Sequence, residues 1–324
     1  YYRRDVFQKR SKSLTISLQN FNNIIVKNYY LIKPVCQYFK KKSQSISLLD
    51  LACGKGGDIP KWIENKVDTV VGIDINENNI YDENDGACVR LENFREKGNV
   101  PKTYFLVGDS SKSINNGDAF NDKSLWKELW LGDNQFNIVT MMFALHYMFK
   151  NEEDLTNLID NIDKNLKKGG YFIGACLDGQ TLFDQLHDIP FNGEIKGIVG
   201  NNIIWKIKKL YKKDTFISEK ESLNYPIGVY MKSINSIITE YLVNFEYFKK
   251  KLEEKNIKLL STHEEEELSI PRSTGLFSRV FEDLEKNQNS SKQGKLFQKI
   301  KKNISDGEKQ ISFMSRYFIF KKGE

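Results

Sequence analysis

The chain has 324 residues, of which 40% are apolar, enough to form one large α/β domain with a substantial core. Its 49 Lys and Arg against 43 Asp and Glu give a net charge of +6, which permits an anionic partner without requiring one. Its four dispersed cysteines and three histidines form no metal-binding pattern, and no apolar run approaches the roughly 20 residues of a membrane-spanning helix. We therefore expect a soluble intracellular protein without a metal site or membrane contact.

The first half of the chain alternates between short apolar runs and helical segments. Residues 1–44 predict a basic arm and then a helix, because NFNNIIVKNYYLIKPVCQYFKK has apolar positions at near-helical spacing. The following alternation is typical of a parallel sheet covered by helices. Strands are predicted at 45–51, 69–75, 103–109, 136–143 and 169–176, with helices after Gly57 and at 85–97 and 152–166. Residues 45–180 are expected to form a cofactor-binding core.

The second half is less regular. Residues 110–135 predict a helix-bearing excursion between two strands, and residues 180–230 an edge or lid insertion rich in Gly, Pro and aromatic residues. Residues 236–261 predict a helix followed by a strand, and residues 310–322 a closing strand. HEEEEL and KNQNSSKQGK are expected to be solvated surface segments. The whole chain, 1–324, is expected to form one doubly wound α/β domain with a mostly parallel seven-stranded sheet, and 181–324 to hold the lid and closing elements.

The strongest local signal is LLDLACGKGGD, residues 48–58, where an apolar strand runs into three glycines and a helix. Glycine lets the backbone turn sharply and approach a ligand at the carboxyl end of a strand, although a tight turn without a ligand would look the same. Asp74 ends the next predicted strand, where a carboxylate can accept both ribose hydroxyls of an adenosine. Asp109 and Ser110 end the third strand, within reach of an adenine edge.

Three nucleotide ligands compete for this turn. A Walker A loop needs GxxxxGK[ST], and Leu49 stands where its first glycine should be, which disfavours an NTPase. A dinucleotide dehydrogenase would present GxGxxG to a pyrophosphate, whereas Asp58 adds negative charge here. S-adenosylmethionine has no phosphate and carries a sulfonium cation, which suits Asp50, Asp58 and Asp74 together.

Seven strings, in this order, carry a family resemblance: NFNNIIVK, LLDLACGKGGDIPKW, GDSSK, FALHYMF, LKKGGYFIG, TEYLVNF and MSRYFIF. From about Asn20 to Phe320 the chain resembles the mRNA cap guanine-N7 methyltransferases, which have the class I S-adenosylmethionine-dependent methyltransferase fold. NDGACVR and CLDG resemble the branch in large cytoplasmic DNA viruses, where this activity is the carboxyl-terminal part of a multifunctional capping enzyme, as in asfarviruses. The start at Tyr1 agrees with such a fragment.

The resemblance implies S-adenosylmethionine as cofactor and 5′-capped RNA (GpppN) as substrate. It also implies RNA triphosphatase and guanylyltransferase domains in the same polypeptide, a monomer, and a place in the host cytoplasm, virus factory or virion. For the cofactor, it implies roles for Lys27 at the methionine carboxylate, for Ala52 and Gly54 through their backbone, for Asp74 at the ribose, for Asp109 with Ser110 at the adenine, and for the neighbouring Asp50 and Tyr147.

For the cap, the resemblance implies Asn22, His146, Tyr147, Glu240 and Tyr317 around the guanine and Lys55, Lys61 and Arg90 along the triphosphate. A carboxylate can accept from guanine N1 and N2, a histidine can donate to O6, and tyrosine rings can pack on the base. The choice between Asn22 and Asn23 stays open, because the spacing to Lys27 is one residue longer than usual.

Two positions depart from the family pattern: Met142 replaces a usual glutamine and Leu177 a usual proline, which puts one cofactor contact and one wall of the cap pocket in question. Each implied residue also has a structural alternative, such as core packing for His146 and Tyr317 or an ordinary surface position for Lys61.

Guanine N7 has a free lone pair in the neutral base, so the predicted methyl transfer needs alignment and no general base. No catalytic residue in the strict sense is therefore expected. The alternatives are another S-adenosylmethionine-dependent methyltransferase acting on RNA or a small molecule, and a cap-binding module without turnover.

Overall fold

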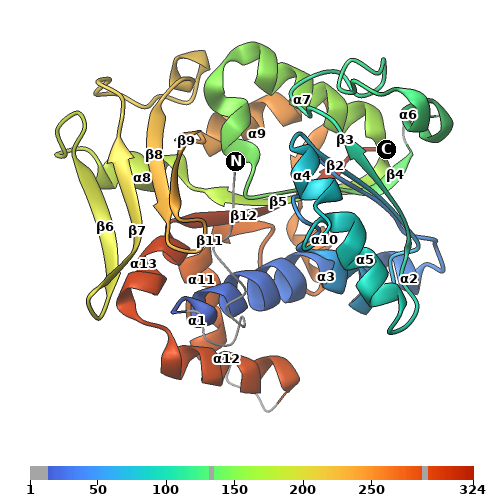
Figure 1. The fold of residues 1–324 in the computed structure, drawn as a ribbon, viewed down its shortest axis with the longest axis horizontal. Coiled ribbons are helices and arrows are strands. Elements are labelled where there is room, and N and C mark those ends of the chain that lie inside the picture. The colour runs from blue at the N-terminus through green and yellow to red at the C-terminus, as the bar shows by residue number, and fades with distance from the viewer. Residues whose placement is uncertain (1–13, 131–134, 287–290) are drawn as a thin grey trace.

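The computed structural model describes residues 14–130, 135–286 and 291–324. The predicted basic arm, YYRRDVFQKRSK, lies outside the described residues. The strands are β1 Ser47–Asp50, β2 Thr69–Asp74, β3 Lys102–Val107, β4 Phe136–Met142, β5 Leu166–Leu177, β6 Glu194–Val199, β7 Asn202–Lys209, β8 Pro226–Met231, β9 Ser236–Tyr241, β10 Ile257–Leu259, β11 Thr274–Leu276 and β12 Ser315–Lys322. The main sheet has the order β10-β12-β5-β4-β1-β2-β3, and β11 pairs with β12 (Figure 1).

Helical segments fill the connections. They are α1 Ile16–Asn20, η2 Phe21–Ile32, α2 Lys33–Lys41, α3 Ile59–Glu64, α4 Glu77–Tyr81, α5 Ala87–Arg95, α6 Ser124–Leu129, η3 Leu145–Lys150, α7 Glu152–Asn165, α8 Gly179–Gln185, η4 Lys220–Ser222, α9 Phe245–Glu253, α10 Thr262–Leu268, α11 Phe277–Lys286, α12 Lys292–Asn303 and α13 Asp306–Phe313. Within the described parts of the chain, none of these helices is both long and apolar enough to cross a membrane.

The centre of the main sheet is parallel. β1 pairs with β2 on one side and β4 on the other, and β5 continues from β4. Strand β4 is buried along its whole length, as expected for a strand covered on both faces. Because the strand order reverses between β1 and β4, the crevice beyond their carboxyl ends is where an open α/β sheet binds its ligands. The predicted doubly wound α/β fold is confirmed.

Two apolar cores lie on opposite faces of this sheet. The first joins η2, α2, α3, α5, α11 and α12 to the sheet, and the second joins α7 and α9. In β12, Tyr317 and Ile319 belong to the first core, and Phe318 and Phe320 to the second, in accordance with the two-residue period of a strand. The helical layers on both faces fix the loops at the carboxyl edge.

The first helical segment is continuous from Ile16 to Lys41, but its middle, η2, is a π-helix of 12 residues. π-Helical turns are rare and concentrate at functional sites. A helix was predicted here from an α-helical period, so its presence is confirmed and its π geometry was not foreseen. Lys27 lies within it and is buried.

The predicted edge insertion is a second, antiparallel sheet of four strands in the order β6-β7-β8-β9, seen to one side of the main sheet in Figure 1. A third apolar core packs its inner face against α8, α13 and Leu18. Strand β9 corrects the prediction that 236–261 begins with a helix. SIITEY alternates between exposed and less exposed positions, and it pairs with β8 from Ser236 to Tyr241.

HEEEEL is largely at the surface, as predicted, with only Leu268 buried, and it belongs to α10, which begins with a capping box formed by Ser261 and Glu264. One predicted boundary needs correction. The closing strand starts at Ser315, because the preceding residues form α13. In KNQNSSKQGK, residues 287–290 lie outside the described parts of the chain, and Lys292 begins α12.

Candidate functional site

The glycine-rich turn follows β1 and faces open space. Gly54 and Gly56 have φ angles of 54° and 67°, a conformation that favours glycine. A Cβ at Gly54 would meet no atom within 4 Å, so this stretch of backbone is open to a ligand. Its N–H donates to Asp74 Oδ2 at 2.8 Å, and Asn79 Nδ2 donates to Asp74 Oδ1 at 2.9 Å. The turn and the end of β2 therefore form one preorganised unit.

Asp109 and Ser110 follow β3 at the same edge. The Ser110 hydroxyl donates to the Leu51 carbonyl at 2.6 Å, which ties the third strand end to the first. Asp109 accepts from the Ser111 backbone N–H at 3.0 Å, and its side chain is one quarter exposed. The three predicted strand ends thus converge, as an adenosine site requires.

A buried cluster of charges lies beneath the turn. The Asp58 carboxylate receives Lys27 Nζ on one oxygen at 2.7 Å and Lys61 Nζ on the other at 2.6 Å. Although burial opposes it, the two ammonium groups lower the pKa of Asp58. Asp50, at the end of β1, has one buried oxygen that finds no hydrogen-bond partner in the described parts of the chain. Burial and the nearby Asp58 raise the pKa of Asp50 to about 7, against the opposing effect of Lys27.

The structure brings His146, Tyr147 and Glu240 together from distant parts of the sequence. His146 lies in η3, which follows β4, and Glu240 lies in β9 of the second sheet. His146 Nδ1 is 3.5 Å from Glu240 Oε2, and both side chains are about nine-tenths buried. The rings of His146 and Tyr147 are 4.2 Å apart, and Tyr147 is 42% exposed. These three side chains lie beside the carboxyl edge that carries the glycine turn.

Burial governs the protonation of this pair. It lowers the pKa of His146 to about 3 and raises the pKa of Glu240 to about 8, so both groups are mainly neutral at pH 7. Both ring nitrogens of His146 are buried without a hydrogen-bond partner among the described residues. Buried polar atoms in folded proteins are nearly always satisfied by protein groups, ordered water or a ligand, so both ring nitrogens remain available to such a partner.

Tyr317 and Asn22 have other surroundings. Tyr317 lies in β12 opposite Ala175, fully buried, with its ring 6.3 Å from that of Tyr30. Its hydroxyl has no hydrogen-bond partner among the described residues, and burial raises its pKa. Asn22 Oδ1 accepts from the Ser312 hydroxyl at 2.7 Å, which links η2 to α13. No contact in the described residues joins either side chain to the His146 and Glu240 pair.

Of the three predicted phosphate-binding residues, two lie together. Arg90 Nη1 donates to the Lys55 carbonyl at 3.0 Å. The Lys55 ammonium contacts the Asp85 carboxylate and lies 3.9 Å from Asp82. Lys61, the third, is buried beside Lys27 and so does not extend from this surface.

The two positions that depart from the family pattern lie in the apolar cores. Met142, the last residue of β4, is buried in the first core, and Leu177 packs against the third. The sequence placed Asp58 among the carboxylates suited to a sulfonium cation, but did not predict its pairing with Lys27 and Lys61. Asp58 precedes α3 at its N-cap, yet its carboxylate makes no cap hydrogen bond and pairs with the two lysines. The GGD motif was the available signal for this position.

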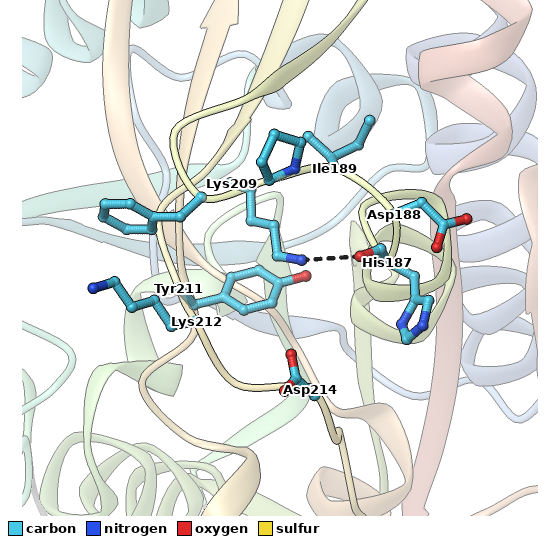
Figure 2. Close-up of a pocket in the computed structure, with 9 residues that line it drawn as sticks. His187, Asp188, Ile189, Lys209, Tyr211, Lys212 and Asp214 are labelled. Carbon is cyan, nitrogen blue, oxygen red and sulfur yellow. Dashed lines mark hydrogen bonds between the residues drawn. The ribbon is translucent and has the colours of Figure 1, made fainter.

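A separate cavity of about 330 Å³ lies at the end of β7 (Figure 2). Lys209 donates there to the His187 carbonyl at 3.2 Å. Its lining includes two lysines, Lys209 and Lys212, and two carboxylates, Asp188 and Asp214. The formal charges balance, so this cavity has no net attraction for an anion.

Comparison with known proteins now identifies the family. The model of the mRNA (guanine-N(7))-methyltransferase domain matches residues 1–323. A probable mRNA-capping enzyme of Acanthamoeba polyphaga mimivirus is 31% identical over 263 residues, which are 77% of this chain and 21% of that protein. The mRNA cap guanine-N(7) methyltransferase of Schizosaccharomyces pombe is 30% identical over 260 residues, which are 78% of this chain and 63% of that protein.

A solved S-adenosylmethionine-dependent methyltransferase from Clostridium acetobutylicum aligns with 94% of this chain and 99% of its own, at 13% identity and a TM-score of 0.47. The matched part spans about a fifth of the mimivirus protein and less than two thirds of the yeast protein. The family match extends over nearly the whole chain, in agreement with the motifs. This chain belongs to the mRNA (guanine-N7)-methyltransferase domain family.

Proposed function

We propose that this chain transfers the methyl group of S-adenosylmethionine to N7 of the terminal guanine of GpppN-capped RNA. The observation that carries the proposal is the buried pair of His146 and Glu240 beside the carboxyl edge that also carries the glycine turn and Asp74. Among the described residues, neither ring nitrogen of His146 has a hydrogen-bond partner. A purine with donors on one edge and an acceptor beside them matches that pair, and an adenosine matches the turn.

Two features support the cofactor site: the backbone at Gly54 is open to a ligand, and one buried oxygen of Asp50 has no hydrogen-bond partner among the described residues. S-adenosylmethionine, when bound, supplies an electrophilic methyl group on a sulfonium. Asp74 would hold the ribose hydroxyls, and Asp109 with Ser110 the adenine. Ala52 and Gly54 would line the methionine half through their backbone, with Lys27 at its carboxylate and Tyr147 near the sulfur.

The proposed guanine site depends on the protonation states of His146 and Glu240. Because His146 is neutral at pH 7, one ring nitrogen can donate to guanine O6 without placing a full positive charge near a base that becomes cationic. Glu240 would ionise as it accepts from guanine N1 and N2, because donors to a carboxylate favour its charged form. Tyr147, which is partly exposed, would pack on the base, and Asn22 and Tyr317 would close the site from η2 and β12.

The chain's contribution to rate is alignment. Guanine N7 needs no deprotonation, so the residues have to hold the base in line with the reacting carbon and exclude water. Lys55 and Arg90 would pair with the cap phosphates, with Asp85 releasing Lys55 when they bind. Charge-assisted pairing of this kind fixes the direction of the triphosphate.

We further propose that residues 1–324 are one monomeric methyltransferase domain of a longer capping polypeptide with RNA triphosphatase and guanylyltransferase domains. Its place would be the host cytoplasm, including the virus factory, or the virion. The support is the match to a mimivirus protein that is several times longer than this chain.

The proposal is tested by incubating the purified chain with GpppG-capped RNA and S-adenosylmethionine, digesting the RNA and identifying the methylated nucleoside by mass spectrometry. We expect 7-methylguanosine alone. A 2′-O-methylated or base-methylated internal nucleoside would establish a different RNA methyltransferase, and cofactor binding without any product would establish a binding module.

A further inference from the structure

The charged cluster beneath the glycine turn contains one lysine more than its ionised carboxylate balances. Lys27, Asp58 and Lys61 are 8%, 6% and 7% exposed, and each lysine pairs with a different oxygen of Asp58. Lys61 Nζ also lies 3.5 Å from the Gly57 carbonyl of the turn itself. A buried charge is costly unless it is paired, so the position of each ammonium group is fixed by its partners.

The elements that carry the cluster are held together next to it. Asn65 Nδ2 donates to Asn28 Oδ1 at 2.7 Å, and Asn28 Nδ2 donates to Glu64 Oε2 at 3.0 Å. These amides join η2 to the end of α3, one residue after Lys27 and a few residues after Lys61. The two lysines therefore reach Asp58 from two docked helices.

The charges of the cluster predict what it attracts. Lys27, Lys61 and the ionised Asp58, whose pKa is lowered, together leave one net positive charge, and Asp50 offsets it only in part because burial keeps Asp50 close to half protonated at pH 7. An incoming carboxylate would meet Lys27, whose charge Asp58 neutralises only in part, since the same carboxylate also serves Lys61. An ammonium group would meet the unpaired oxygen of Asp50.

We propose that Lys61 is a positioning residue for the amino-acid half of S-adenosylmethionine. By sharing Asp58, Lys61 prevents Asp58 from pairing with Lys27 alone, and so keeps Lys27 Nζ available to the cofactor carboxylate. This inference rests on the proposed function, and it moves Lys61 from the RNA path to the cofactor site.

The test compares two ligands that differ only in the amino-acid group. Calorimetry measures the affinity of wild type and Lys61→Met for S-adenosylhomocysteine and for 5′-methylthioadenosine, which lacks that group. We expect Lys61→Met to weaken the affinity for S-adenosylhomocysteine by roughly tenfold or more, because a buried charge network loses one member. The affinity for 5′-methylthioadenosine should change by less than about twofold. Lys61→Arg, which keeps the charge, should restore most of the affinity.

Lys66→Met is the matched control, because Lys66 is exposed and follows the same helix, and its affinities should equal those of wild type. If Lys61→Met does not fold, Lys61→Gln, which keeps a donor without the charge, replaces it. Unchanged S-adenosylhomocysteine affinity in the folded variant, or an equal loss for both ligands, would overturn the inference. Failure of the wild type to bind S-adenosylhomocysteine would instead overturn the proposed function.

Discussion

At the residue scale, burial alone gives His146 and Glu240 their proposed roles. The same loss of solvation that makes the imidazole a neutral donor also keeps a proton on the carboxyl group until a ligand replaces water. Once Glu240 is ionised its carboxylate can only accept, and in that form the proposed pair would select a partner that donates to Glu240 and accepts from His146. Guanine meets both conditions, and adenine, with an acceptor at N1, does not.

Replacing Glu240 by Gln should abolish most cap recognition without affecting the cofactor. The amide would direct donors toward the donors of guanine, so kcat/KM for GpppG should fall by about 100-fold or more, as when buried polar groups are left unpaired. Steady-state kinetics measures this, with S-adenosylhomocysteine affinity as the internal reference. Glu246→Gln, at an exposed side chain of α9, is the control. A Glu240→Gln variant with the kinetics of the control would exclude Glu240 from the site.

The pH dependence should follow Glu240. The free protein holds a proton on this group below a pKa of about 8. The proposed contact with guanine N1 and N2 uses the ionised form. At saturating S-adenosylmethionine, kcat/KM for the cap should therefore rise with pH through about 8 and level off above it, whereas Glu240→Gln should lack this rise. The pH profile of both proteins tests the assignment. A flat wild-type profile between pH 6 and 8 would contradict it.

The same shift affects stability in a defined direction. The folded-state pKa of Glu240 is raised above its ordinary value of 4.5 to about 8, so the native state holds a proton that the unfolded chain has released. Its contribution to stability is present at low pH and is lost as pH rises through about 8. Glu240→Gln should remove this part of the pH dependence in denaturant unfolding.

At the scale of elements, the turn after β1 combines two glycines with positive φ and one without. Gly54 has a φ of 54° and faces open space, whereas Gly57 faces open space without a positive φ. Neither position is crowded, so a comparison of the two shows the effect of the left-handed backbone at Gly54.

Gly54→Ala should destabilise the fold by about 1–2 kcal/mol, the cost of a left-handed conformation for an L-residue, and should weaken S-adenosylhomocysteine binding because its Cβ enters the space open to the ligand. Gly57→Ala should leave both unchanged. Urea unfolding and calorimetry measure the two effects. If Gly54→Ala bound S-adenosylhomocysteine as tightly as Gly57→Ala, the backbone of Gly54 would not line the cofactor.

Element predictions succeeded where one period was unambiguous. The strands β1 to β5 are apolar runs bounded by polar or glycine residues. Their existence and their parallel pairing could be predicted from the sequence. SIITEY was assigned to a helix because it precedes a true amphipathic helix, α9, with only a short break. The π geometry of η2 could not be foreseen, since π-helices are rare and the apolar positions were interpreted at the α-helical period.

At the scale of the whole molecule, the site depends on contacts that no local pattern encodes. Asp74 could be predicted because an acidic residue at the end of the strand that follows a glycine turn, about 20 residues on, is the usual ribose contact in this type of sheet. Glu240 reaches His146 only because the second sheet docks through its own core, and that docking arises from tertiary packing. The resemblance placed Lys61 along the cap triphosphate, with an ordinary surface position as the alternative, whereas the structure buries it in a pair with Asp58. Lysine is rarely buried without such a pair.

The central claim is that an adenosine at Asp74 and a guanine at Glu240 occupy one continuous site. A crystal structure of the chain with S-adenosylhomocysteine and GpppG tests this most directly. We predict the ribose hydroxyls on Asp74, guanine N1 and N2 on Glu240, and N7 facing the sulfur. Guanine bound elsewhere, or an N7 directed away from the sulfur with Glu240 unoccupied, would contradict the claim.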